Sequence, residues 1–184
     1  MSIDSLNDWK STFAALPNVS DSSWTSNLAG WVNDRVTNKA TLNGGGGTTP
    51  IFTFGQAALE SGLSTMTLTS DQSAAINSLA TAFESAFLAS AMVVATGFWF
   101  GSPLPTTTFS SVTTSLIDVA SVALAKAKIL ELATAPLVSD PNDSHFPVKI
   151  RDAFLLLTVT TIGFDQTPPA TGPLPLTDAA RSVI

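Results

Sequence analysis

The chain begins with two short segments in which apolar residues recur every three or four positions, the spacing of one helix face. The first covers residues 4–16 and stops before Pro17, because the residue before a proline disfavours the helical conformation. The second runs from a capping residue, Asp21 or Ser22, to about Asn38. The apolar positions of both segments are Leu6, Trp9, Phe13, Leu16, Trp24, Leu28, Trp31, Val32 and Val36. We predict a helical hairpin in which the tryptophans pack together.

Two longer apolar segments are predicted to form the central helices. One covers residues 72–96, begins at a cap on Asp71 and is followed by Gly97. The other covers residues 110–135 and ends before Pro136. One face of this second segment carries Val112, Leu116, Val119, Ala123, Ala127 and Leu130, and further apolar residues lie on other faces. A helix that is apolar around its circumference is typical of one with neighbours on several sides.

Shorter segments carry weaker patterns. Residues 51–54 are predicted to be extended, and residues 56–62 to be a short helix that ends in glycine. Residues 65–69 alternate like a strand, and whether they pair with residues 51–54 stays open. Residues 147–162 are predicted to be a helix, although the β-branched residues 158–162 also fit a strand.

Glycine and proline mark two irregular regions. Residues 43–50 contain four consecutive glycines, which favours a flexible hinge. A phosphate-binding loop would need Lys and then Ser or Thr after its last glycine, and Thr-Thr-Pro follows here. Residues 166–176 contain four prolines and are predicted to be extended. We therefore expect one helical domain over residues 1–164 and an extended arm over residues 165–184.

These elements predict a mainly α fold. It is a helical bundle with two long central helices, room for a small β element, and an extended, proline-rich C-terminal arm.

Charge is scarce in this chain. Asp, Glu, Lys and Arg make up 12% of the residues, about half the usual share of roughly 25%. None of them occurs in residues 85–117. The net charge of −6 argues against a nucleic-acid surface, which needs clustered Lys and Arg. So little charge suggests that other molecules cover part of the surface.

The sequence offers few groups for chemistry. It has no cysteine and one histidine, His145, in a polar stretch with no catalytic partner at a recognisable spacing. Residues 140–144 contain acids but lack the glycine and closing glutamate of a calcium-binding loop. Most of the 14 acidic residues lie near helix starts or on polar faces. We expect no enzyme activity, cofactor or metal, and an unrecognised carboxylate pair is the second alternative.

A membrane span is also not expected. The longest apolar run, residues 86–100, is shorter than the roughly 20 residues that cross a bilayer. The N-terminal segment lacks the basic and apolar regions of a secretory signal.

The hypothesis that these features favour is a structural assembly subunit. A virion protein of a bacteriophage (capsid, neck or tail) fits best, made in the host cytoplasm and forming symmetric multimers with itself and with other structural proteins. The contact residues predicted from the aromatic turn and the arm are Phe98, Trp99, Phe100, Pro168, Pro169, Pro173, Leu174, Pro175 and Leu176. The arm has no core of its own, so we expect a neighbouring subunit to order it. The first alternative is a membrane-active or lipid-binding helical protein, and a cytoplasmic location is the alternative to the virion.

Overall fold

The computed structural model describes residues 3–16, 22–43, 45–46, 50–67, 69–94, 99–100, 111–135, 145–165 and 174–184. Its helices are α1 (Leu6–Ala14), α2 (Trp24–Val36), α3 (Gln56–Ser64), α4 (Gln72–Ala89), α5 (Val119–Leu130), the 3-10 turn η1 (Glu131–Ala133) and α6 (His145–Leu156). Its strands are β1 (Gly45–Gly46), β2 (Ile51–Thr53), β3 (Ala91–Val93), β4 (Trp99–Phe100), β5 (Ser111–Ile117), β6 (Thr158–Asp165) and β7 (Leu174–Ser182). The predicted fold class, mainly helical with small β elements, is confirmed.

Side chains fix the start of two helices. The Ser5 hydroxyl accepts a hydrogen bond from the Asp8 backbone N–H at 3.3 Å, at the start of α1. The Asp71 carboxylate accepts from the N–H groups of Ser73 and Ala74 at 2.9 and 3.2 Å, at the start of α4. Each cap satisfies N–H groups that have no partner within the helix.

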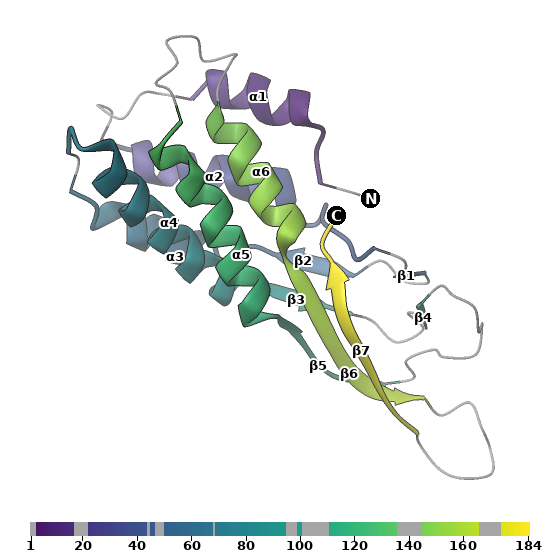
Figure 1. Ribbon diagram of the computed structural model, residues 1–184. Coiled ribbons are helices and arrows are strands. Elements are labelled where there is room, and N and C mark those ends of the chain that lie inside the picture. Colours follow the sequence, from purple (N-terminus) through teal and green to yellow (C-terminus); the bar gives the residue numbers. More distant parts are fainter. Residues whose placement is uncertain are drawn as a thin grey trace.

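The helices follow a closed circuit. Each one packs against the next along the chain, and α6 returns to α1. In Figure 1, α4, α5 and α6 form the nearer layer, with α2 and α3 behind them and α5 between α4 and α6. The segment predicted to contain the central helix does contain one, although the helix is shorter than predicted.

Aromatic rings fill the inside of this circuit. The ring of Phe154 on α6 lies 5.1 to 6.4 Å, between ring centres, from those of Trp9, Phe52, Phe54 and Phe87. Trp9 also meets Trp31 edge to face at 5.1 Å, as the hairpin prediction expected.

Three antiparallel sheets complete the fold. β1 pairs with β4, β2 with β3, and β6 lies between β5 and β7. Figure 1 shows β6 leaving the end of α6 and running with β7 beyond the helices. The C-terminus is held against the start of the glycine-rich region, where Thr41 and Ile184 exchange backbone hydrogen bonds of 2.9 Å.

The prediction of one helix over residues 110–135 was wrong in its first part. Ser111–Ile117 is a strand, and α5 begins at Val119. The change occurs at Asp118, whose carboxylate accepts hydrogen bonds of 2.7 Å from the hydroxyls of Thr158 and Thr160. These partners lie 40 or more residues away, so local spacing could not reveal them.

Two other helices end earlier than predicted. α4 stops at Ala89, where the Ser90 hydroxyl donates to the Ala86 carbonyl and accepts from the Gly55 N–H, and β3 follows. α6 stops at Leu156, so the strand alternative for residues 158–162 was correct. The partner of β2 is β3, and the described part of residues 65–69 forms no strand.

Part of the predicted arm belongs to the chain's own sheet. β7 pairs with β6 from Thr158↔Ser182 to Asp165↔Leu174, and the side chain of Val183 is fully buried. The expectation that only a neighbouring subunit would order the arm is therefore wrong for these residues. In the predicted glycine hinge, Gly45–Gly46 pairs with the backbone of Trp99–Phe100.

Candidate interaction surface

Helix α5 is apolar on two faces. The inner face, Ser121, Val122, Ala125 and Ile129, is buried. The outer face carries Val119, Ala120, Ala123, Leu124 and Ala127, all exposed. Val119 is 71% exposed and Leu124 is 59% exposed. Residues at these intervals form one continuous stripe on a helix, so α5 presents an uncovered apolar face.

Helix α4 extends this face on one side. The Gln72 side chain at the start of α4 donates to the carbonyls of Leu132 and Ala135, so α4 and α5 are antiparallel. Glu84 and Lys126 form an ion pair of 2.6 Å between the two helices. One helical turn beyond Glu84 lies Leu88, which is 54% exposed and level with Ala123.

Helix α6 and strand β5 extend the face further. Glu131 and Lys149 form an ion pair between the end of α5 and the start of α6. Leu156, seven residues after Lys149, is therefore level with Leu124, seven residues before Glu131. Leu156 is 36% exposed, and Leu116, at the end of β5, is 62% exposed. We call this surface the aliphatic patch: Leu88, Leu116, Val119, Ala120, Ala123, Leu124, Ala127 and Leu156.

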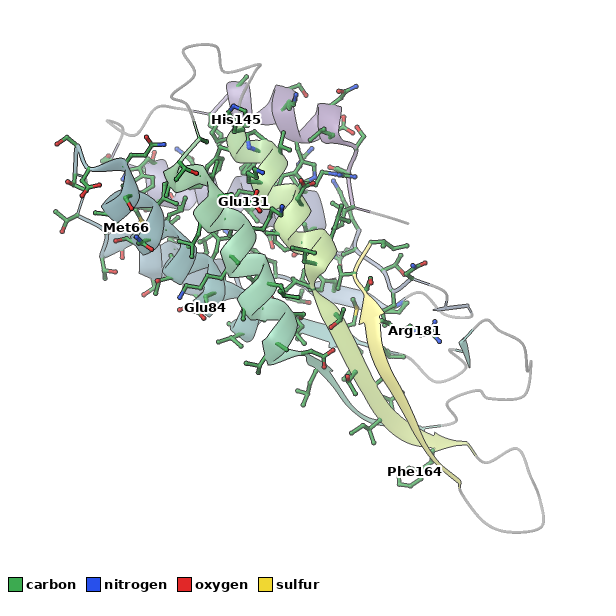
Figure 2. All side chains as sticks on the ribbon, viewed as in Figure 1. Met66, Glu84, Glu131, His145, Phe164 and Arg181 are labelled. Atoms are coloured by element: carbon green, nitrogen blue, oxygen red, sulfur yellow. The ribbon has the colours of Figure 1, made fainter. Side chains whose placement is uncertain are left out.

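Charged groups border the aliphatic patch. Lys128 pairs with Glu131 at 2.7 Å, and Glu131 also pairs with Lys149. Figure 2 shows Glu84 beside the lower half of α5 and Glu131 near its upper end. Hydrogen bonds from Lys128 and then Lys149 lower the pKa of Glu131, and the same bond to Glu131 raises the pKa of Lys128. At the other end of α5, Asp118 is half-buried.

Two polar grooves lie elsewhere on the described surface. A groove of about 570 Å³ between the end of α3 and α4 is lined by Met66, Asn77, Ser78 and Thr81, among others. None of its lining residues is ionisable, and the hydroxyls of Ser78 and Thr81 donate to carbonyls of their own helix. Figure 2 labels Met66 at this end of the molecule.

The second groove lies between α1 and α2. It has a volume of about 400 Å³, and its ionisable lining residues are Asp34 and Arg35. On its wall, the Trp31 indole N–H donates to the Thr12 hydroxyl at 2.9 Å. The linings of these two grooves do not bring two carboxylates together, as acid–base chemistry on a carboxylate pair would require.

The contact residues predicted from sequence fall into two groups. Trp99 and Phe100 form β4, and Leu174, Pro175 and Leu176 form the start of β7. The others, Phe98, Pro168, Pro169 and Pro173, lie outside the described residues. All nine contacts stay predictions. His145 is the first residue of α6, and Figure 2 labels it at the N-terminal end of this helix.

The apolar pattern of residues 110–135 indicated an aliphatic surface but did not locate it. Leu116, Val119, Ala123 and Ala127 belong to the apolar stripe of residues 110–135, and all four are exposed. Which side of α5 is buried depends on where the chain turns at Asp118 and on how the inner face of α5 packs. Both depend on contacts with α4, α6 and β6, which are distant in sequence.

Neither a metal-binding cluster nor a membrane-spanning helix occurs in the residues that the structure describes. In the ranges given above, no group of three or more His, Cys, Asp or Glu side chains is placed to hold a metal ion. None of the helices in those ranges is long and apolar enough to cross a bilayer. Comparisons with protein-family models, curated proteins and solved structures gave no match.

Proposed function

We propose that this protein is a structural subunit of a multimeric assembly, with the particle of a bacteriophage (capsid, neck or tail) as its setting. The observation that carries the proposal is the aliphatic patch. Large exposed apolar areas in proteins mark contact sites, whereas scattered apolar residues do not. In the patch, Leu88 on α4 and Leu156 on α6 lie level with Ala123 and Leu124 of α5, the helix between them.

The magnitude of the burial favours an assembly with several contacts per subunit. Covering the exposed part of five Leu and Val side chains contributes on the order of 5 kcal/mol per subunit. Association costs about 4–15 kcal/mol in lost translational and rotational freedom. One patch is therefore a marginal contact by itself, and further contacts in a closed multimer would stabilise it. The low charge of the chain, 12% of its residues, supports such a role.

Light scattering during gel filtration tests the proposal, at subunit concentrations from about 1 to 200 μM. We expect the mass to rise with concentration to a whole multiple of the 19.1 kDa chain. Electron microscopy of the largest species should show symmetric particles. A constant mass of one chain over the whole range would contradict the proposal.

A flotation assay with neutral phospholipid vesicles distinguishes the lipid alternative. The patch would bind lipid by the same apolar side chains, so the proposal expects the protein to stay at the bottom of the gradient. Strong flotation that Leu124→Glu abolishes would favour a lipid-binding protein over an assembly subunit.

A further inference from the structure

We infer that Asn43 is the preferred site of spontaneous deamidation in this chain, a reaction that consumes water and releases ammonia. Asn43 is followed by Gly44, and none of the other seven asparagines precedes a glycine. Asparagine is among the residues that shorten the lifetime of proteins at high temperature. This chemistry belongs to one side chain and its neighbour, and it is independent of the proposed function.

The reaction begins with an attack by the main chain on the Asn43 side chain. The backbone nitrogen of residue 44 forms a bond to Cγ of Asn43, and the bond from Cγ to Nδ2 breaks. Nδ2 leaves as ammonia and takes the proton that the attacking nitrogen loses. Water then opens the cyclic imide at either of its carbonyls. The products are aspartate and isoaspartate, and in isoaspartate the main chain passes through the former side-chain carbon.

A glycine after the asparagine favours this attack. Glycine has no Cβ, so no side chain hinders the approach of Cγ to its backbone nitrogen. Asn-Gly is also a typical turn sequence, and Asn43 lies in a turn. The other asparagines precede residues with side chains, which stand beside the attacking nitrogen.

The structure leaves the side chain of Asn43 accessible to water. Asn43 is exposed and directly follows Leu42, whose backbone bridges to Val183. The Asn43 backbone N–H donates to the Ser182 carbonyl at 2.9 Å, whereas no described residue hydrogen-bonds its side chain. The amide group that reacts is therefore free of the contacts that hold the backbone of the same residue.

Asparagines on helices are held in a conformation that opposes the reaction. Within a helix, the next backbone N–H bonds to a carbonyl on the preceding turn, so its nitrogen reaches Cγ only when the helix opens locally. Asn77 on α4 is the matched comparison, because it is exposed and precedes the small residue Ser78. Its side chain also donates to the Ser73 carbonyl at 2.9 Å.

The product would change the backbone at a point that lies between two paired segments. Before Asn43, Thr41 and Ile184 exchange backbone hydrogen bonds. After it, Gly45–Gly46 pairs with Trp99–Phe100. Aspartate adds a negative charge between these segments, and isoaspartate adds a carbon atom to the main chain that joins them.

Peptide mapping by mass spectrometry tests the inference on the full chain, incubated in its folded state at neutral pH. The exchange of an amide for a carboxyl group changes the mass of one peptide, and fragment spectra assign the change to one asparagine. We expect Asn43 to lose its amide at least about tenfold faster than Asn77, a ratio that needs a barrier difference of only ~1.4 kcal/mol. Chromatography separates the isoaspartate and aspartate products.

Gly44→Ala tests the role of the following residue. It keeps the asparagine and adds a methyl group beside the attacking nitrogen. We expect the loss of the Asn43 amide to slow by about tenfold, while the rate at Asn77 stays unchanged. A far-ultraviolet circular dichroism spectrum like that of the unmodified chain shows that the variant has folded.

Two results would overturn the inference. Loss of the amide at Asn77 as fast as at Asn43 would show that the Asn-Gly turn is not a preferred site. An unchanged rate at Asn43 in Gly44→Ala would show that the backbone nitrogen of residue 44 does not carry out the attack. The assembly role would stand in either case, because the mass measurements test it separately.

Discussion

At the scale of single residues, two glycines on helices differ sharply in their surroundings. A Cβ at Gly62 on α3 would lie 2.7 Å from the Cβ of Ala82 on α4, closer than real Cβ atoms come. A Cβ at Gly30 on α2 would meet nothing nearer than 3.9 Å. Gly62 thus allows the close approach of α3 and α4, and Gly30 has no such role.

Alanine substitutions should therefore act in opposite directions at these two sites. We expect Gly62→Ala to lower the free energy of unfolding by about 1–2 kcal/mol, because the helices must separate. Gly30→Ala should raise it by about 0.5–1 kcal/mol, because alanine favours the helix and fits the space. Urea denaturation measures both values, and a stabilising Gly62→Ala would show that the helices do not pack so closely.

Glu131 gives a second prediction at this scale. Its pKa lies below the ordinary value of 4.5, chiefly because Lys128 donates a hydrogen bond to it. Its contribution to stability is thus present above pH 4.5 and is lost as the pH falls through the lowered pKa. Lys128, whose pKa is raised above 10.5, contributes below that pH and loses its contribution as the pH rises through the raised pKa.

Carboxyl-detected NMR measures the titration of Glu131. We expect a midpoint below 4.5 in the unmodified chain, and a return toward 4.5 when Lys128 and Lys149 are both replaced by Gln. A midpoint at or above 4.5 in the unmodified chain would mean that these contacts do not persist in solution.

At the scale of elements, strand β7 makes part of the predicted C-terminal arm belong to the chain's own sheet. Its backbone pairs with β6 and its following residue, Val183, is buried against the core. Deleting residues 174–184 should remove these bonds, expose the edge of β6 and destabilise the fold. We expect a fall in Tm of at least 10 °C, since about 2–4 °C corresponds to each kcal/mol in a domain of roughly this size and the deletion removes several kcal/mol of backbone pairing and burial.

Differential scanning calorimetry checks this prediction, and removal of Ile184 alone is the milder control. A truncated protein with unchanged Tm would show that β7 contributes little to the fold. The expectation that a neighbouring subunit orders the arm would then regain its basis.

The sequence predicts elements well where the signals are local. The predicted cap at Asp71 and the apolar stripes of α1 and α2 lie within a few residues of the elements they define. The strands depend on distant partners. The stripe through Val112, Leu116 and Val119 has helical spacing by coincidence, because it crosses from β5 into α5 at Asp118.

The sequence predicted that the candidate surface is apolar but not which residues form it. Excess apolar residues on the segment of α5 predicted a face covered by another molecule, and the structure leaves Val119 and Leu124 of that segment exposed. That another molecule covers them stays a prediction. The inner and outer faces could not be told apart, because ion pairs and packing with α4 and α6 set the rotation of α5. The aromatic turn and the proline-rich segment were predicted to be contacts from their composition alone, and this role stays a prediction.

At the scale of the whole molecule, the six described helices enclose an aromatic core and leave the aliphatic patch uncovered. The core residues Trp9, Phe87 and Phe154 are fully buried. Val119 and Leu124, on the outer side of the same layer, are more exposed than covered. A closed circuit of helices has completed its own core, so the remaining apolar face is available to another molecule.

Sedimentation equilibrium of the unmodified chain beside Leu124→Glu tests this account most directly. We predict that the unmodified chain shows a concentration-dependent mass above 19.1 kDa, and that Leu124→Glu stays at the mass of one chain with an unchanged circular dichroism spectrum. Thr81→Glu, at an exposed polar site on α4, should assemble normally. Equal masses for the unmodified chain and Leu124→Glu at every concentration would contradict the claim that the aliphatic patch is a contact between subunits.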